Sequence, residues 1–113
     1  MTCNGWRRIM THGSADRGTV LIDTEAVKGV AIVEGDHLEL VEIKLSESGT
    51  VAPHVLPIEV LFYVIKGTCR IRIGEKSLDA PAGTAVVSPA GIEKSIECLG
   101  GEPAVILACK RLT

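Results

Sequence analysis

The stretch GTAVVSPAGIEKS, residues 83–95, decides the fold of this chain. Small and β-branched residues run up to Ser88, Pro89 and Gly91 interrupt the run, and apolar and polar residues alternate after the glycine. Two such runs separated by proline and glycine predict two strands joined by a turn. We therefore expect β-structure on both sides of this turn.

The second of these strands carries a lysine on its apolar side. Lys94 shares its parity with Ile92, Ile96 and Cys98, while glutamate and serine residues occupy the alternate positions. Because successive side chains of a strand point to opposite faces, Lys94 is expected to face the interior with the isoleucines. An ammonium group on a buried face calls for an explanation.

The whole chain of 113 residues has the same strand-like punctuation and no long helical pattern. Runs rich in valine, isoleucine and leucine alternate with Gly, Pro, Asp or Ser every six to twelve residues. We predict a single all-β domain, a sandwich or small barrel. Its strands are expected near 19–23, 30–34, 38–45, 50–54, 59–66, 68–73, 76–79, 84–88, 92–98 and 103–110. The apolar parity changes near Leu40, which predicts a bulge or a bend of the strand there.

Composition excludes several classes of partner. The net charge of −2 offers no basic surface for nucleic acid, and only three residues are aromatic. No run of apolar residues is long enough to cross a membrane, and the N-terminus has no apolar signal core. The four cysteines form no CxxC pair. We expect a reduced cytoplasmic protein.

The chain divides into an N-terminal arm, residues 1–18, and one domain, residues 19–113. The arm is expected to be extended, and mobile unless Trp6 and Ile9 dock on a neighbour. Within the domain, residues 60–65 and 104–109 are apolar on both faces. One face can form the interior, and the other needs cover from a second subunit. A homodimer is therefore expected.

Two motifs in this chain resemble those of the cupin family. Gly83, five residues, Pro89-x-Gly91, two residues and Lys94 resemble the second cupin motif, in which a histidine stands at the lysine position. Cys98 stands at that motif's asparagine position. Residues 49–67 resemble the first motif, with one residue fewer before its first histidine. The resemblance implies a double-stranded β-helix, the cupin or jelly-roll barrel.

In the family, two histidines and a glutamate of the first motif and the histidine of the second hold a metal. The corresponding positions here are His54, Leu56, Val60 and Lys94. One imidazole does not hold a metal tightly, and a protonated lysine has no lone pair to donate. We therefore predict no cofactor. The alternative is a divalent metal held by His54 and Glu59, with oxygenase-type chemistry, if a bulge at Pro57 turns Glu59 inward.

Lys94 then has several interpretations. As a structural residue it would extend its ammonium to water or pair with a carboxylate such as Glu59. As a functional residue it would act as a base or amine nucleophile with a lowered pKa, or stay charged and hold an anionic group. Cys98 is expected to be inert packing.

The predicted pocket binds a small organic molecule, and an anionic one would suit it. Its expected lining is His54, Leu56, Glu59, Val60, Phe62, Lys94, Ile96 and Cys98. A second hypothesis is a metal-free sugar isomerase or epimerase with His54 as general base and Lys94 beside it, which resembles known metal-free cupins. Tyr63, the only tyrosine, is expected to face away from the cavity, which disfavours full epimerase chemistry.

Overall fold

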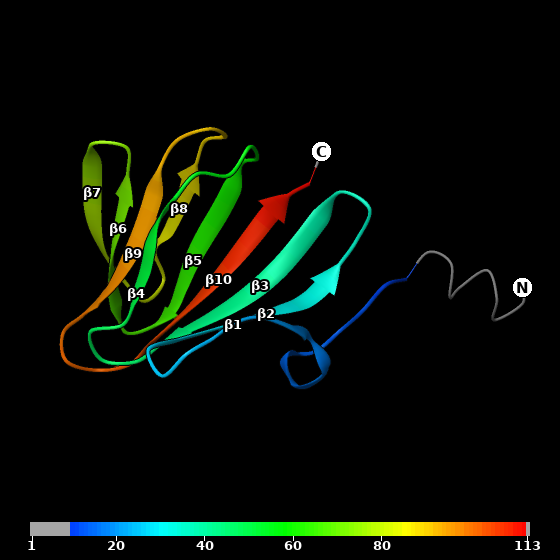
Figure 1. The fold of residues 1–113 in the computed structure, drawn as a ribbon, viewed down its shortest axis with the longest axis horizontal. Helices are drawn as coiled ribbons and strands as arrows, with labels where there is room; N and C mark the ends of the chain where they lie inside the picture. Colours follow the sequence, from blue (N-terminus) through cyan, green and yellow to red (C-terminus); the bar gives the residue numbers. More distant parts are fainter. Residues whose placement is uncertain (1–9, 113) are drawn as a thin grey trace, which may run out of the picture.

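The computed structural model describes residues 10–112 as two antiparallel sheets packed face to face (Figure 1). The six-stranded sheet has the order β1 (Thr19–Asp23), β2 (Val27–Glu34), β3 (Leu38–Leu45), β10 (Ala104–Arg111), β5 (Val60–Lys66) and β8 (Ala85–Ser88). The four-stranded sheet has the order β4 (Thr50–His54), β9 (Lys94–Leu99), β6 (Thr68–Ile73) and β7 (Lys76–Pro81). The prediction of an all-β jelly-roll barrel is confirmed.

The ten predicted strands are all present, with bounds that differ by at most a few residues. Alternation was a reliable guide because each strand buries one face against the opposite sheet. Gly67 joins β5 to β6 with φ +77°, a conformation that favours glycine. A Cβ there would also lie 2.8 Å from the Pro103 carbonyl oxygen, so the turn packs closely against the chain entering β10.

Two local expectations were wrong. β3 pairs with β10 without interruption from Leu38 to Leu45, so it has no bulge at Leu40. An irregularity does lie beside Leu40, but it belongs to the partner strand, where the β2 register shifts between Ala31, opposite Val41, and Val33, opposite Leu40. β9 begins at Lys94, and Ile92 lies in the preceding turn, where it is exposed.

The core lies between the sheets. The inner faces of β3, β5 and β10 supply Val41, Leu45, Phe62, Val64 and Ile106, all nearly inaccessible to solvent. Across from them lie Cys69, Ile71, Ile96 and Cys98 of β6 and β9. This arrangement confirms the predicted inward parity of both strands of the second sheet.

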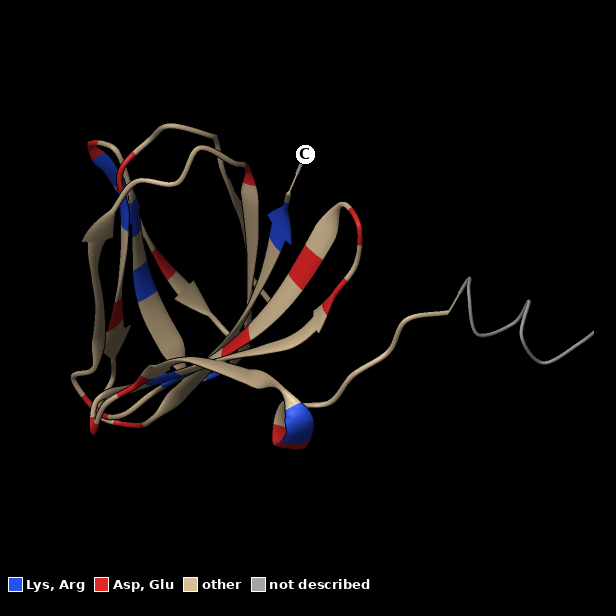
Figure 2. Ribbon diagram, turned by 45° about the vertical axis from the view of Figure 1, so that its right-hand side comes forward, with Lys and Arg blue, Asp and Glu red and all other residues tan. Residues whose placement is uncertain are grey.

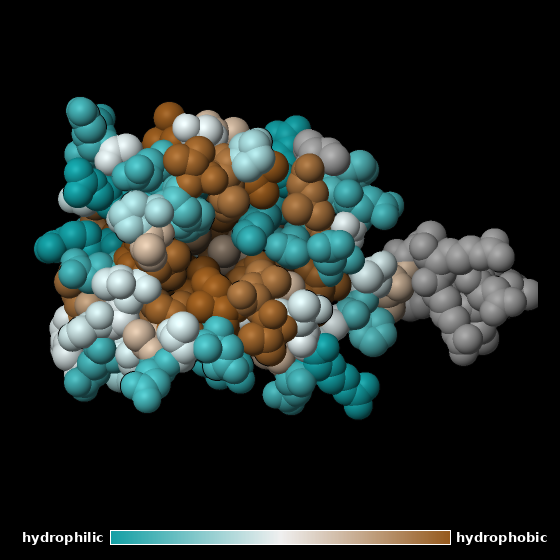
Figure 3. All heavy atoms as spheres, in the orientation of Figure 1, coloured by the Kyte–Doolittle hydropathy of each residue, from teal (hydrophilic) through white to brown (hydrophobic). Residues whose placement is uncertain are grey.

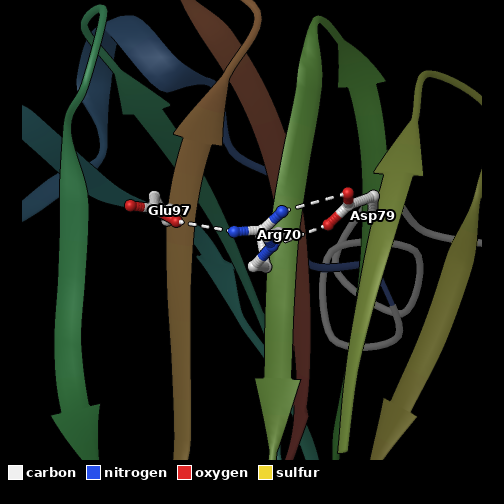
Figure 4. A network of polar contacts seen from close by, with 3 residues as sticks. All are labelled: Arg70, Asp79 and Glu97. Carbon is white, nitrogen blue, oxygen red and sulfur yellow. Dashed lines mark hydrogen bonds and ion pairs between the residues drawn. The ribbon is translucent and has the colours of Figure 1, made fainter.

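The two outer faces differ in character. On the four-stranded sheet, Arg70 lies between Asp79 and Glu97, with N–O distances of 2.8 and 3.7 Å (Figure 4). On the six-stranded sheet, Leu61, Tyr63 and Ile65 of β5 are 41–45% exposed. Charges of both signs are interspersed along the described chain (Figure 2). Within residues 10–112, the apolar outer face of the six-stranded sheet is the one that lacks cover.

The described part of the N-terminal arm runs beside β2. It contains a single 3₁₀ turn, Ala15–Arg17, and Gly13 and Gly18 lie against the backbone of β2. The expected docking residues Trp6 and Ile9 lie outside the described residues. No helix within residues 10–112 is long and apolar enough to cross a membrane.

Candidate functional site

A row of polar residues crosses the inner face of the six-stranded sheet near one end. The strand registers place Glu34 opposite Glu39, Glu39 opposite Lys110, Lys110 opposite Val60, and Val60 opposite Ser88. Directly paired residues of an antiparallel sheet project from the same face. Because Val60 is buried in the core, the row faces the interior. The Lys110 ammonium lies 3.4 Å from the Glu39 carboxylate.

The opposite sheet contributes two further polar residues at its own strand ends. His54 of β4 is paired with Lys94 of β9, which is paired with Ile73 of β6. Lys94 is 1% exposed, and His54 is half-buried. The imidazole ring of His54 and the side chain of Lys94 therefore project from the inner face of this sheet.

Lys94 is buried with little compensation. Its Nζ donates one hydrogen bond, 3.4 Å long, to the carbonyl oxygen of Ile92, and makes no ion pair with any residue of 10–112. An ammonium has three hydrogens to donate, so its capacity is largely unused. Burial lowers the pKa of Lys94 below its ordinary value of 10.5. The two structural interpretations, exposure to water and pairing with Glu59, are both contradicted.

His54 is held in one orientation by its own strand. Its Nδ1 lies 3.0 Å from the carbonyl oxygen of Ala52. Since a carbonyl only accepts hydrogen bonds, Nδ1 carries the proton in this arrangement. In a neutral ring held this way, Nε2 is the nitrogen with the free lone pair, which is what a general base or an acceptor of a ligand hydrogen bond requires.

A cavity of about 150 Å³ lies between the sheets beside these residues. In Figure 3, brown, hydrophobic side chains lie above and below the hollow near the centre, with teal, hydrophilic ones at its sides. Five residues of the predicted pocket line the cavity, namely His54, Leu56, Val60, Phe62 and Ile96. The sequence did not indicate the others, Leu21, Ile22, Gly29, Val41, Ile43, Val51, Ala108 and Lys110. The lining is apolar apart from His54 and Lys110.

Three predicted pocket residues do not line this cavity. Glu59 is exposed and lines a groove on the outer face, with Leu61 and Arg111, because no bulge reverses its parity. Cys98 is buried below the cavity lining, and its Sγ donates to the carbonyl oxygen of Glu102 at 3.0 Å. Lys94 is the register partner of His54 but is not among the residues that line the cavity.

Ser88 is a polar residue that sequence reasoning missed. Its side chain is fully buried, and its Oγ has no hydrogen-bond partner in the described chain. A buried hydroxyl without a partner is costly, so such groups call for an explanation. The alternation of the strand could have predicted this position, because Ser88 points to the same face as Val86, which packs against the core.

The residues at the family's metal positions do not fit a metal ion. They are one imidazole, two aliphatic side chains and an ammonium group, and Glu59 does not join them. Nowhere in residues 10–112 do three histidine, cysteine or acidic side chains gather as a metal cluster would require.

The fold has many solved relatives of low sequence identity. An RmlC-like cupin from Shewanella frigidimarina aligns with a TM-score of 0.78 at 12% identity, over 90% of both chains. KdgF from a Halomonas species aligns with a TM-score of 0.78 at 14% identity, over 90% of this chain and 94% of its own. A predicted oxalate decarboxylase from Thermotoga maritima aligns with a TM-score of 0.77 at 17% identity, over 89% and 98%. These likenesses show the fold alone.

Sequence comparison gives the family directly. No curated protein matches the chain in sequence. The model of the cupin domain matches residues 40–109, which run from β3 to β10 and include both motifs and most of the cavity lining. The chain belongs to the cupin domain family.

Proposed function

We propose that this protein binds a small organic ligand with an apolar body and an anionic group inside the barrel, without a metal. The observation that carries the proposal is the buried ammonium of Lys94, which has one long hydrogen bond and no ion pair within the described chain. A buried charge is costly unless it is paired. A ligand anion supplies the missing partner.

The apolar body of the ligand would occupy the cavity. Its volume of about 150 Å³ and its valine, leucine, isoleucine and phenylalanine lining suit a body of roughly the size of benzene. His54 and Lys110 are the polar groups at its wall, so one end of the ligand would be polar. An apolar pocket with a few convergent polar groups is the usual form of a small-molecule site.

The anionic group would lie at the polar end of the interior. Ser88 and Lys94 flank the turn 89–93, and both side chains are buried and face inward. Both are donors without adequate acceptors, and a carboxylate accepts hydrogen bonds from a hydroxyl and an ammonium at once. An aromatic or branched aliphatic carboxylic acid is therefore the ligand class we expect.

A matched pair of probes tests the proposal. Benzoate and benzamide share the ring but differ in charge, and their binding is measured by calorimetry and by the shift in melting temperature. We expect wild type to bind the acid and not the amide, and Lys94→Met to lose the acid. Equal binding of both probes, or full retention by the variant, would refute the anionic site. Branched aliphatic acids with their amides extend the test to other ligand shapes.

A second candidate is the metal-free isomerase hypothesis, which the direct pairing of His54 with Lys94 favours. In this reaction His54 Nε2 would remove a proton from the carbon next to a carbonyl, and the Lys94 ammonium would stabilise the resulting enolate oxygen. Return of the proton to the other face or to the neighbouring carbon would complete an epimerisation or isomerisation.

Hydrogen exchange separates the two candidates. Incubation of small 2-hydroxy ketones and aldose sugars in D₂O should give enzyme-dependent deuterium incorporation next to the carbonyl if His54 is a base. His54→Gln would abolish that exchange but leave acid binding by Lys94 intact. Absence of exchange across the panel, together with acid binding, would favour the binding function alone.

A further inference from the structure

We infer that Cys69 and Cys98 are a modification site, a pair of core thiols placed to form a reversible disulfide across β6 and β9. The two residues are direct register partners in the four-stranded sheet. Both are free thiols in the structure, both are buried, and both belong to the same core cluster. The inference does not depend on the proposed function.

The hydrogen-bond pattern defines what kind of pair this is. The amide of Cys98 donates to the carbonyl oxygen of Gly49, on the β4 side, so its backbone polar groups point away from β6. The amide of Gly74 donates to the Glu93 carbonyl oxygen, which marks a hydrogen-bonded position of the same ladder. Hydrogen-bonded and non-bonded pairs alternate along an antiparallel ladder. Both observations make the cysteines a non-hydrogen-bonded pair.

Such a pair brings side chains closer than any other in a sheet. Its Cα atoms lie about 4.5 Å apart, and its Cβ atoms about the same. Disulfides require Cα separations of about 4.4–6.8 Å and Cβ separations of about 3.5–4.5 Å. The Cα separation is at the short limit of its range and the Cβ separation at the long limit, so the bond is reachable with small backbone movement. Strain of this kind makes a disulfide easier to reduce, which suits reversible chemistry.

The electrostatics of the two thiols agree with this proximity. Burial, with a contribution from Cys98, raises the pKa of Cys69 to about 11. Burial also raises the pKa of Cys98, as do the nearby Glu102 and Glu47, although a backbone hydrogen bond from Ser48 acts in the opposite direction. Few thiolates are present at neutral pH, so the pair stays reduced in a reducing compartment and reacts slowly elsewhere.

Cys98 is the thiol through which oxidation would begin. It is 5% exposed, whereas Cys69 is fully buried, and it lies next to the turn that contains Gly100 and Gly101. With glutathione disulfide as oxidant, the Cys98 thiolate attacks one sulfur and releases one glutathione thiolate. The Cys69 thiolate then attacks Cys98 Sγ, and the second glutathione leaves. Two protein thiols are oxidised, two glutathione molecules are formed, and they take up the two protons.

The bond would act on the strand that carries the candidate site. Lys94 and Ile96 precede Cys98 on the same face of β9, and Ile96 lines the cavity. A disulfide that draws β9 toward β6 at Cys98 would therefore shift Ile96 in the cavity wall, although neither cysteine lines the cavity. This gives oxidation a route to the ligand pocket without a thiol in the pocket itself.

The test uses the full chain with Cys3→Ser and Cys109→Ser, which leaves only the two core thiols. After equilibration with excess glutathione disulfide at pH 8.5, we expect a monomer whose mass is lower by two hydrogen atoms. No thiol should be alkylated when this protein is unfolded, and dithiothreitol should restore both thiols. In wild type, trypsin should release residues 67–70 joined to residues 95–110, with fragment ions assigning the bond to Cys98.

The matched control moves the cysteine by one residue. Adding Cys98→Ala and Glu97→Cys to the same background places the thiol opposite Arg70, on the other face of β9. This folded variant should form only the mixed disulfide with glutathione. Three outcomes would overturn the inference. The Cys3→Ser, Cys109→Ser protein could keep two alkylatable thiols after oxidation, or it could stop at the mixed disulfide with glutathione. The shifted control could also form an internal disulfide to the same extent.

Discussion

Lys94 of β9 lies directly opposite His54 of β4, so a buried ammonium and an oriented imidazole share one row of the barrel interior. The row faces the polar side chains Glu39, Lys110 and Ser88 of the other sheet. Lysine and histidine side chains thus give this end of the barrel interior its polarity. The consequences are measurable.

The first prediction concerns the stability of Lys94→Met as a function of pH. The pKa of Lys94 is lower in the folded protein than the 10.5 of an unfolded lysine. Between these two values the unfolded chain binds more protons, so this residue makes wild-type stability rise with pH, and its destabilising effect is complete below the folded pKa. The stability of Lys94→Met should not show that rise. At pH 7 its free energy of unfolding should exceed that of wild type by on the order of 1 kcal/mol, because an apolar group replaces a buried charge.

Denaturant unfolding of both proteins from pH 7 to pH 10.5 checks this, since groups other than Lys94 cancel in the difference. Lys94→Arg is the control, because its guanidinium stays charged throughout the range. A Lys94→Met variant less stable than wild type at every pH would mean that the ammonium has partners within the protein.

The second prediction concerns the cavity. Ala108 of β10 lies between Val41 and Phe62 in the sheet, and all three line the cavity. Ala108→Leu adds three carbons to this wall, and the cavity has room for them. We expect the variant to remain folded and to lose benzoate binding by at least tenfold, measured by calorimetry.

A matched variant keeps that test specific. Ala85 lies on the outer side of β8, opposite Tyr63, so Ala85→Leu adds the same atoms away from the cavity. It should bind as wild type does. Unchanged binding in Ala108→Leu would place the ligand elsewhere on the molecule.

The third prediction concerns metal content. One imidazole beside an ammonium does not make a site for iron, manganese, zinc, copper or nickel. Protein purified without an affinity tag or chelator should contain well below one equivalent of these metals by elemental mass spectrometry. One equivalent that disappears in His54→Ala would instead demonstrate a metal site that His54 forms with ligands from outside the two cupin motifs.

The fourth prediction concerns the outer face of the six-stranded sheet. Leu40, Cys109, Leu61 and Val87 form one cross-strand row there, and Leu107 and Tyr63 belong to the next. We expect a second copy to cover this apolar face, so Leu61→Glu should shift the protein from dimer to monomer in analytical ultracentrifugation. Ser77→Glu, on the other sheet, should leave the dimer intact. A wild-type protein that is monomeric at high concentration would contradict the expectation.

Local pattern was enough to predict the strands of this fold. The inward direction of Lys94 and the outward direction of Tyr63 followed from parity alone, because side chains alternate along each strand. The motif around Gly83 and Gly91 then pointed to the cupin family. None of these inferences needed to know which strands are neighbours.

The parts of the candidate site that the sequence did not predict all depend on strand register. Nothing in the sequence places Lys110 beside Glu39, or Cys69 beside Cys98, since each pair joins distant segments. The cavity wall from Leu21 and Ile22 was missed for the same reason. Register is set by the packed sheets as a whole, and a single strand does not encode it.

The position of β10 has a consequence for how the protein is made. This strand lies between β3 and β5, in the middle of the six-stranded sheet, although it is last in the chain. During synthesis the sheet is divided into β1-β2-β3 and β5-β8 until residues 104–111 have left the ribosome. We expect those two fragments to expose the unpaired edges of β3 and β5 meanwhile, so that the six-stranded sheet is completed only when β10 is added. Nascent chains arrested before residue 104 should therefore depend most on chaperones.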